Sequence, residues 1–298
     1  MSVHPRAVAR ALPVAAARRL AMRGSRFASA LPRALRSRPA SHARASPARG
    51  RPAADRGSHV LTTAGWNDFE WGAAKIVSNE PATKEGGLRS VKIAVDAELA
   101  RAYQVPGQFV QMRRGEDDKP AFLAIASPPD AASGVFELLI KPSDGVAGEV
   151  CKAPVETAVE ISPPMGKGFD LGADAEKVNT TLLVATGSGV SPIRALIKSG
   201  ALDGQNVTLY YGTASPAYTA FEGEFGEWRE TFGVEVVNVQ SRVGGPPTYV
   251  QDAIKDDVEN LDAATTRAVL CGQKEMTEAV IAILEGAGVP KERCVMNF

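Results

Sequence analysis

The sequence contains few histidines and few cysteines. Its three histidines, His4, His42 and His59, all lie near the N-terminus, so the rest of the chain has no imidazole. This absence argues against a Ser-His or Cys-His nucleophile pair, a His-ligated zinc ion and a His-ligated haem there. The three cysteines are too few for a four-thiolate cluster or a disulfide framework. Any redox chemistry therefore requires a bound organic cofactor.

Acidic residues are absent before Asp55, whereas 13 of the 34 Lys and Arg residues lie at or before Arg56. This Arg-, Ala-, Ser- and Pro-rich stretch predicts a disordered targeting peptide over residues 1–58. A basic arm that binds nucleic acid is the alternative, but the stretch has no Lys cluster and no interleaved aromatic residues. The Ser and Pro content favours the chloroplast stroma and the Arg and Ala content the mitochondrial matrix, so composition leaves both open.

The remainder of the chain is acidic. From Gly57 onward there are 21 basic and 33 acidic side chains, a net charge of about −12. This balance argues against nucleic-acid or anionic-membrane binding through bulk charge. No run of eighteen apolar residues occurs, so no transmembrane segment is expected. The length suffices for two domains of ordinary size.

Residues 66–170 consist of short apolar or alternating runs separated by turn residues such as Pro106-Gly107 and Ser143-Asp144-Gly145. This pattern predicts a six-stranded antiparallel β-barrel with one short helix over 146–153. The runs expected to form strands are WGAAKIVSN (71–79), SVKIAVD (90–96), GQFVQM (107–112), AFLAIAS (121–127), VFELLIKP (135–142) and TAVEIS (157–162).

From residue 177 to 298 the rhythm changes to an apolar run, a glycine or turn, and an amphipathic segment, repeated. This alternation predicts an α/β domain with a parallel sheet covered on both faces. The expected strands are 180–185, 206–211, 234–240, 267–271 and 293–298. The expected helices are 191–199, 216–232, 249–258 and 274–287.

A glycine-rich loop follows the first expected parallel strand. It consists of Gly187, Ser188, Gly189, Val190, Ser191 and Pro192. Glycines allow the backbone to approach a pyrophosphate, proline suits a first helical turn, and the helix N-terminus adds positive potential. Ser191 is the expected N-cap, with a hydroxyl that can also reach phosphate. Such a loop alone also occurs as a tight corner in many α/β proteins, so it is not decisive.

This loop resembles the Gly-Thr-Gly-Ile-Ala-Pro loop of the ferredoxin-NADP reductase superfamily, and the resemblance covers about residues 71–298. A second match is Cys271-Gly272 with Met276 shortly after. The resemblance implies that Cys271 lies beside the nicotinamide. A buried small residue that ends a core strand is the alternative role for this cysteine.

The third match is Ser241-Arg242 followed by Tyr249, which in NADP-preferring relatives hold the adenosine 2′-phosphate and the adenine. Arginine can grip phosphate through two parallel hydrogen bonds, and no carboxylate stands there for an NAD ribose. The resemblance thus implies NADPH in preference to NADH. One departure is Pro247, where many plastid relatives carry a lysine.

The flavin half departs most from the family pattern. The family's Arg-x-Tyr-Ser-x-x-Ser strand falls on 121–127, where Ala126 and Ser127 end the run and only the final serine matches. A second flavin element, at a helix N-terminus, falls on Val146, Ala147 and Gly148. Lys141 can supply the missing positive charge for a flavin pyrophosphate. The resemblance still implies FAD at these positions.

Relatives often place an aromatic residue over the flavin at the chain end, which makes Phe298 a candidate gate; capping of the hydrophobic core is the alternative. The function implied is an NADPH-dependent flavin oxidoreductase that passes electrons to a diffusible acceptor, either ferredoxin or a small molecule. The alternative is a non-catalytic NADP(H)-binding or electron-transfer accessory protein that has lost tight flavin binding. Because ferredoxins are acidic, the net charge of about −12 disfavours steering of that partner.

Overall fold

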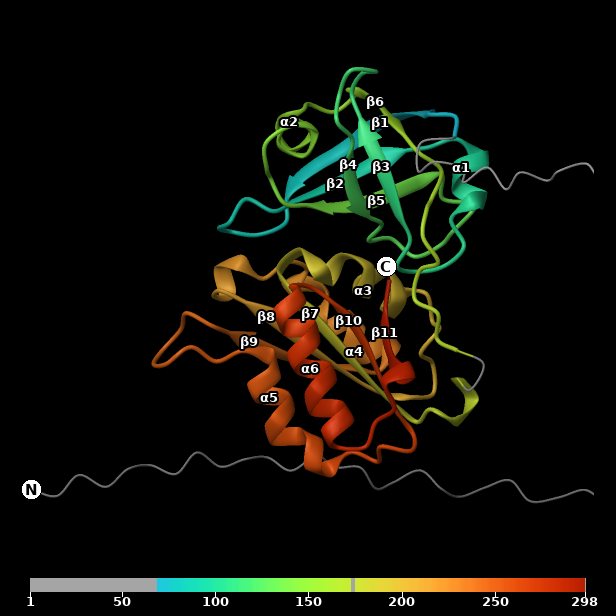
Figure 1. The fold of residues 1–298 in the computed structure, drawn as a ribbon. Helices are drawn as coiled ribbons and strands as arrows, with labels where there is room; N and C mark the ends of the chain where they lie inside the picture. Colours follow the sequence, from blue (N-terminus) through green and yellow to red (C-terminus); the bar gives the residue numbers. More distant parts are fainter. Residues whose placement is uncertain (1–68, 173–174, 298) are drawn as a thin grey trace, which may run out of the picture. The chain divides into compact units, whose positions relative to one another are not determined.

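The computed structural model describes residues 69–172 and 175–297. The expected targeting segment 1–58 and the candidate gate Phe298 lie outside these residues. The described chain forms an antiparallel sheet followed by a parallel sheet, drawn in cyan to green and in yellow to red (Figure 1). None of the helices described is both long and apolar enough to cross a membrane.

The first sheet has the strand order β4-β3-β6-β1-β2-β5. It closes on itself through the bridge between Ile125 and Leu138 and through the Ala126 amide, which donates to the Glu137 carbonyl at 2.7 Å. The expected six-stranded barrel is confirmed. Its strands are β1 (Gly72–Pro81), β2 (Arg89–Ala94), β3 (Phe109–Arg113), β4 (Ala121–Ala124), β5 (Val135–Ile140) and β6 (Ala158–Ile161).

Alternate residues of these strands fill the barrel interior. Val91 and Ile93 of β2, and Val110 and Met112 of β3, are fully buried there. Helix α2 (Val146–Lys152) forms as expected. Helix α1 (Ala97–Ala102) was not expected, because six residues with two buried side chains give too little periodicity. It is nucleated by Asp96, whose carboxylate caps its first turn.

The second sheet is parallel throughout, with the order β11-β10-β7-β8-β9. Both faces of its central strand are buried, since Leu183 and Ala185 pack on one helical layer and Leu182 and Val184 on the other. Its strands are β7 (Thr180–Thr186), β8 (Asn206–Thr213), β9 (Val234–Gln240), β10 (Thr266–Cys271) and β11 (Cys294–Met296). Helices α3 (Val190–Lys198) and α4 (Phe225–Phe232) cover one face, and α5 (Val250–Asp257) and α6 (Lys274–Gly286) the other (Figure 1).

The predicted bounds of two elements in this half were wrong. The helix expected over 216–232 is instead two 3₁₀ turns, Pro216–Tyr218 and Glu222–Glu224, followed by α4. Phe221 adopts a left-handed conformation (φ 58°), which an α-helix cannot contain. The last strand spans only Cys294–Met296, shorter than the expected 293–298.

The strand order also locates a binding site. From β7 the chain passes through α3 to β8 on one side, whereas β10 joins β7 on the other side. In open α/β sheets, ligands bind outside the carboxyl ends of the strands at such a switch point. The glycine-rich loop leaves β7 at this place.

Candidate functional site

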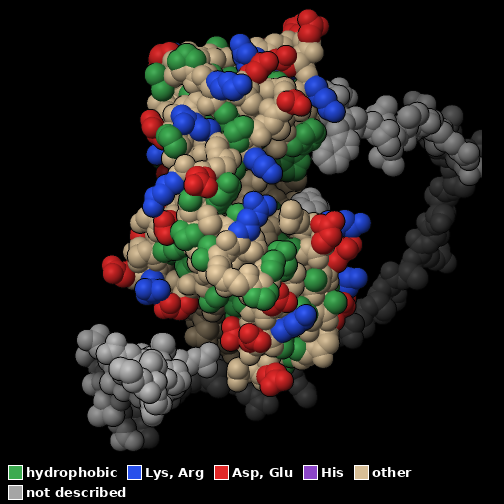
Figure 2. Space-filling model, turned by 90° about the vertical axis from the view of Figure 1, so that its left-hand side faces the viewer, with side chains coloured by type: hydrophobic (Ala, Val, Ile, Leu, Met, Phe, Trp, Pro, Cys, Tyr) green, Lys and Arg blue, Asp and Glu red, His purple; other side chains and the backbone are tan. Residues whose placement is uncertain are grey.

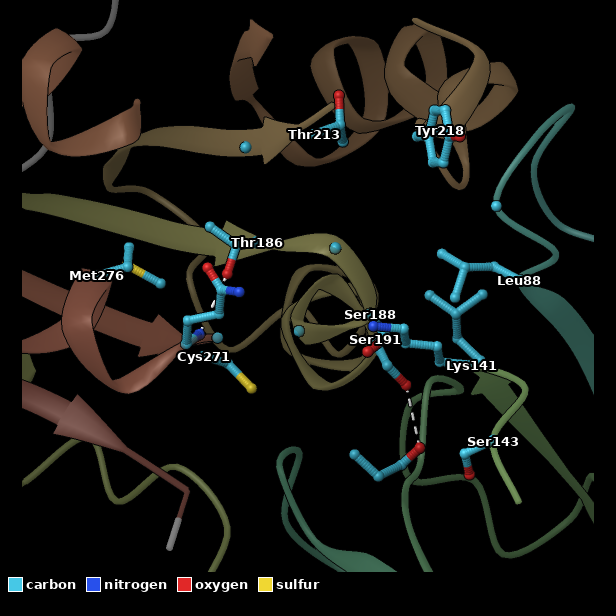
Figure 3. A pocket seen from close by; sticks show the side chains of 18 of the residues that line it. Leu88, Lys141, Ser143, Thr186, Ser188, Ser191, Thr213, Tyr218, Cys271 and Met276 are labelled. Atoms are coloured by element: carbon cyan, nitrogen blue, oxygen red, sulfur yellow. Dashed lines mark hydrogen bonds between the residues drawn. The ribbon is translucent and has the colours of Figure 1, made fainter. Parts of the chain in front are cut away.

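A cleft of about 1230 Å³ lies at the carboxyl ends of β7, β8 and β10. Its walls come from both sheets: the glycine-rich loop, the ends of β9 and β10 and the start of α5 on one side, and β4, the end of β5 and the start of α2 on the other. Figure 3 shows the first helical turn of α3 in its centre. The structure therefore brings the nucleotide and flavin halves of the expected site into one cavity.

The glycine-rich loop is held by close backbone contacts. Gly187 has φ +53°, a conformation that favours glycine, and a 3₁₀ turn over Gly187–Gly189 leads into α3. A Cβ at Gly189 would collide with the Cys271 carbonyl, so β10 requires glycine there. The Gln273 amide donates to Thr186 Oγ1 at 3.2 Å and ties the end of β10 to the loop. The loop and the Cys-Gly turn thus form one rigid cradle.

Two residues of the expected phosphate loop have other roles. Val190 is fully buried and packs in the core beside α3. Ser191 is not the N-cap of α3, which is Gly189. Although Ser191 lines the cleft, it is 2% exposed and its hydroxyl donates to the Ala124 carbonyl at 3.0 Å. That hydroxyl is already bonded to the barrel, so in this structure it is not free to donate to a phosphate. Backbone N–H groups and the hydroxyl of Ser188, which lines the cleft, remain the donors the loop can offer.

The expected adenine end lines the opposite part of the cleft. The Ser241 and Arg242 amides donate to the Thr213 and Ala214 carbonyls, each at 2.9 Å, which fixes the backbone of the pair. The Arg242 side chain is exposed. Tyr249 stands immediately before α5 with half of its side chain exposed, and its amide donates to the Asp252 carboxylate at 3.0 Å. A fixed backbone carrying a free guanidinium and a free ring suits a phosphorylated adenosine.

Cys271 and Gly272 line the cleft, and Figure 3 shows Cys271 beside the glycine-rich loop. Burial raises the pKa of the Cys271 thiol to about 12, so this thiol is neutral at physiological pH. It is therefore suited to van der Waals contact and not to nucleophilic attack. Met276 also reaches the lining, but it is 4% exposed and packs beneath Gly272, so its contribution is to support the turn.

On the barrel side, Lys141, Val146 and Ala147 line the cleft, whereas Ala126, Ser127 and Gly148 do not. The Ser127 hydroxyl accepts a hydrogen bond from the Glu137 amide at 3.1 Å and so closes the barrel.

Ala126 and Gly148 also serve the packing of the barrel and not the cleft. Ala126 is fully buried. A Cβ on Gly148 would collide with the Ser143 carbonyl, so this glycine allows α2 to pack on its preceding turn.

Phe122 is a cleft residue that the sequence reasoning missed. It is 60% exposed, lines the cleft from β4, and stacks at a tilt on Phe109 with 5.8 Å between the ring centroids. The family position for an aromatic, one residue later, is held by Leu123, which is buried against the barrel core. The sequence pattern could have revealed Phe122, because an aromatic residue that alternates with the buried positions of its strand points outward.

The charges of the cleft favour an anion. Its basic side chains are Lys119, Lys141 and Arg242, and its acidic ones are Asp144 and Glu275. Within residues 69–172 and 175–297 none of the three cations forms a salt bridge. Figure 3 shows Lys141 extending from the end of β5 toward Ser188 of the glycine-rich loop. This cation from the barrel thus points toward the anion cradle of the parallel sheet.

Comparison with known proteins agrees with this geometry. Residues 183–281 match the model of the oxidoreductase NAD-binding domain. Over 246 residues the chain is 32% identical to the fruit protein pKIWI502 of Actinidia deliciosa, covering 77% of each chain. The chain belongs to the ferredoxin-NADP reductase superfamily. Its members are NAD(P)-binding oxidoreductases, so a redox role is the class of function that membership assigns.

Two further similar proteins carry different names. Over 181 residues the chain is 29% identical to the electron transfer subunit of dihydroorotate dehydrogenase B (NAD(+)) from Listeria welshimeri, covering 59% of this chain and 66% of the subunit. The structure of a ferredoxin NADP⁺ reductase from Neisseria gonorrhoeae with bound FAD and NADP has the same fold, with a TM-score of 0.60 and 18% identity. That alignment covers 73% of this chain and 92% of the other.

Proposed function

We propose that this protein is an NADPH-dependent flavin oxidoreductase that passes electrons to a diffusible acceptor. The observation that carries the proposal is the continuity of the cleft: one cavity joins the glycine-rich loop, the Arg242 end and the exposed barrel face around Phe122 and Lys141. A nicotinamide and a flavin must meet face to face for hydride transfer, which requires such a shared space.

The residues present fit NADPH. The turn Gly187–Gly189 offers backbone N–H groups at the start of α3 to a pyrophosphate, in a cradle too tight for other residues at Gly189. Arg242 and Tyr249 bind the 2′-phosphate and the adenine. Cys271, held neutral by burial, contacts the nicotinamide end without reacting with it.

The residues present also fit FAD, although through different groups from those of the family motif. Lys141 replaces the missing arginine as the cation for the flavin pyrophosphate, and Phe122 offers an exposed aromatic face to the isoalloxazine. When bound, FAD supplies the chemistry of accepting a hydride from NADPH and releasing electrons one or two at a time. The protein's own part is to hold the two ring systems together and to exclude water.

A titration with FAD followed by turnover tests the proposal. The full chain, saturated with FAD, should oxidise NADPH in the presence of ferricyanide or a soluble quinone, and omission of FAD should abolish this rate. The Arg242→Gln variant should need more NADPH for half-maximal rate. NADPH oxidation with no dependence on FAD would contradict the proposal.

A second candidate is a non-catalytic NADP(H)-binding or electron-transfer accessory protein. The observation that favours it is the apolar run from Ala121 to Ala126, in which no side chain offers a charge or hydrogen bond to a flavin. A protein that binds NADPH but takes up no flavin at micromolar concentration would support this candidate.

We also propose the acceptor class and the compartment. In Figure 2, acidic and basic side chains are interspersed on the face shown, which provides no broad patch of one sign for a highly charged partner. The net charge of about −12 from Gly57 onward also disfavours an acidic ferredoxin, so a small molecule is favoured as acceptor. The Ser- and Pro-rich N-terminus supports import into a chloroplast, and its Arg and Ala content makes the mitochondrion the alternative. Imaging of a C-terminal fluorescent fusion distinguishes the two compartments.

A further inference from the structure

Arg194 is a buried cation on helix α3, two residues after the glycine-rich loop. Its side chain is 8% exposed. Its Nε and Nη2 atoms donate to the Glu224 carboxylate, with distances of 2.8 Å to Oε2 and to Oε1 respectively. The Phe221 ring lies under the guanidinium, 4.6 Å from its centroid to Cζ. These contacts anchor the Arg194 guanidinium within the α/β half of the molecule.

The same guanidinium also holds the barrel. Nη1 lies 3.1 Å from the Glu137 carboxylate of β5 and donates to the Ala126 carbonyl at 3.0 Å. Glu137 is itself fixed by the Ser90 hydroxyl, which donates to its other oxygen at 2.7 Å. One side chain of α3 therefore binds two paired residues of the barrel, Ala126 and Glu137, that lie far before it in the sequence.

The position of these contacts matters for the cleft. Ala126 follows β4 by two residues, and β4 carries Phe122 on the cleft wall. At the other end of the linkage, α3 begins directly at the glycine-rich loop. A rigid bond between α3 and the segment after β4 thus fixes the distance between the nucleotide wall and the flavin wall. A bidentate guanidinium restricts both distance and orientation, which a lysine cannot do.

We propose that Arg194 is a positioning residue for hydride transfer, which sets the spacing of the two half-sites without touching either ligand. This inference rests on the proposed function. A change at Arg194 should lower the rate at which NADPH reduces a bound flavin but leave binding of the adenine end, which needs only the α/β half, unchanged. A residue with a purely structural role would change both quantities together.

The variants Arg194→Met, Arg194→Lys and Glu137→Gln test this proposal. Lys198→Met is the matched control, because Lys198 pairs with Glu224 and Glu227 on the α/β half alone. In Arg194→Met, the Kd of 2′-phospho-AMP should stay within about twofold, while the rate of flavin reduction by NADPH should fall about tenfold or more. Arg194→Lys should recover little of this rate, and Lys198→Met should lose none.

Hydrogen exchange supplies a readout that needs no flavin. Amides of residues 121–127 should exchange about tenfold faster in Arg194→Met and in Glu137→Gln, but not in Lys198→Met. If Arg194→Met leaves both this exchange and the reduction rate unchanged, the proposal is overturned. It is also overturned if affinity for 2′-phospho-AMP falls as much as the reduction rate. A wild-type protein that takes up no flavin would refute the proposed function, while the exchange experiment would still test the linkage.

Discussion

The hydroxyl of Ser191 in α3 donates a hydrogen bond to the backbone carbonyl of Ala124 in β4, with 3.0 Å between the two oxygens. The two residues are 67 positions apart, one in a helix of the α/β half and the other in a strand of the barrel, and both line the cleft. A residue expected to bind phosphate thus joins the two walls of the cavity instead.

Ser191→Ala should lower the stability of the fold and not the affinity for NADPH. The change leaves the Ala124 carbonyl without this buried donor, which costs about 1–3 kcal/mol in the free energy of unfolding. Urea unfolding measures this loss of stability. The control is Ser143→Ala, which removes an exposed hydroxyl at the cleft rim. Unchanged stability with weaker NADPH binding would show that the hydroxyl contacts phosphate after all.

Arg242→Gln should convert a preference for NADPH into indifference between NADPH and NADH. Loss of a charge-assisted contact with the 2′-phosphate should raise the Kd of NADPH about tenfold or more, while that of NADH changes little. Arg229→Gln is the control, since Arg229 is exposed, pairs with Glu235, and does not line the cleft. Equal effects on both nucleotides would mean that Arg242 is an ordinary surface residue.

Lys141→Met should weaken FAD binding by about tenfold or more, because it removes a cation from the flavin side of the cleft without changing the apolar wall. Quenching of flavin fluorescence on binding gives the Kd. Lys92→Met removes another exposed lysine, on β2 away from the cleft, and should leave the Kd of FAD unchanged. If riboflavin, which has no phosphate, loses as much affinity as FAD, Lys141 does not bind the pyrophosphate.

Glu224→Gln should reduce stability at neutral pH and flatten its acid dependence. Burial alone would raise the pKa of Glu224, but hydrogen bonds and charge from Arg194, with Lys198 and Trp228, together hold it below its ordinary value of 4.5. A lowered pKa means that the carboxylate stabilises the fold above that ordinary value and that this contribution disappears as the pH falls through the folded pKa. The variant should be less stable by about 1–3 kcal/mol at pH 7.

The difference between wild type and Glu224→Gln should therefore narrow below about pH 4.5. Thermal unfolding midpoints of both proteins, measured from pH 3 to pH 8, follow this difference in stability. A constant difference over the whole range would mean that the charge of Glu224 contributes nothing to folding.

Much of the fold follows from local patterns in the sequence. The apolar run Thr180–Thr186 and the glycines after it predict a buried parallel strand and an anion cradle, because both depend on neighbouring residues. The family resemblance placed the Ser241-Arg242 pair and Cys271 at the nucleotide site, and in the structure all three line the cleft at the ends of strands.

What could not be predicted depends on contacts between distant segments. Ala126 and Ser127 turn away from the cleft because the barrel closes there on β5. The hydroxyl of Ser191 and the guanidinium of Arg194 find their partners 67 and 68 residues away, so no local pattern reveals them. The left-handed Phe221 broke an expected helix because tertiary contacts override helix propensity.

We propose that one cleft holds both a nicotinamide and a flavin close enough to react. Anaerobic spectroscopy of the full chain saturated with FAD can test this proximity. Addition of NADPH should bleach the flavin absorption near 450 nm within seconds, and NADH at the same concentration should act more slowly. A flavin that binds but stays oxidised with NADPH, or a protein that binds NADPH and never takes up FAD, would contradict the account.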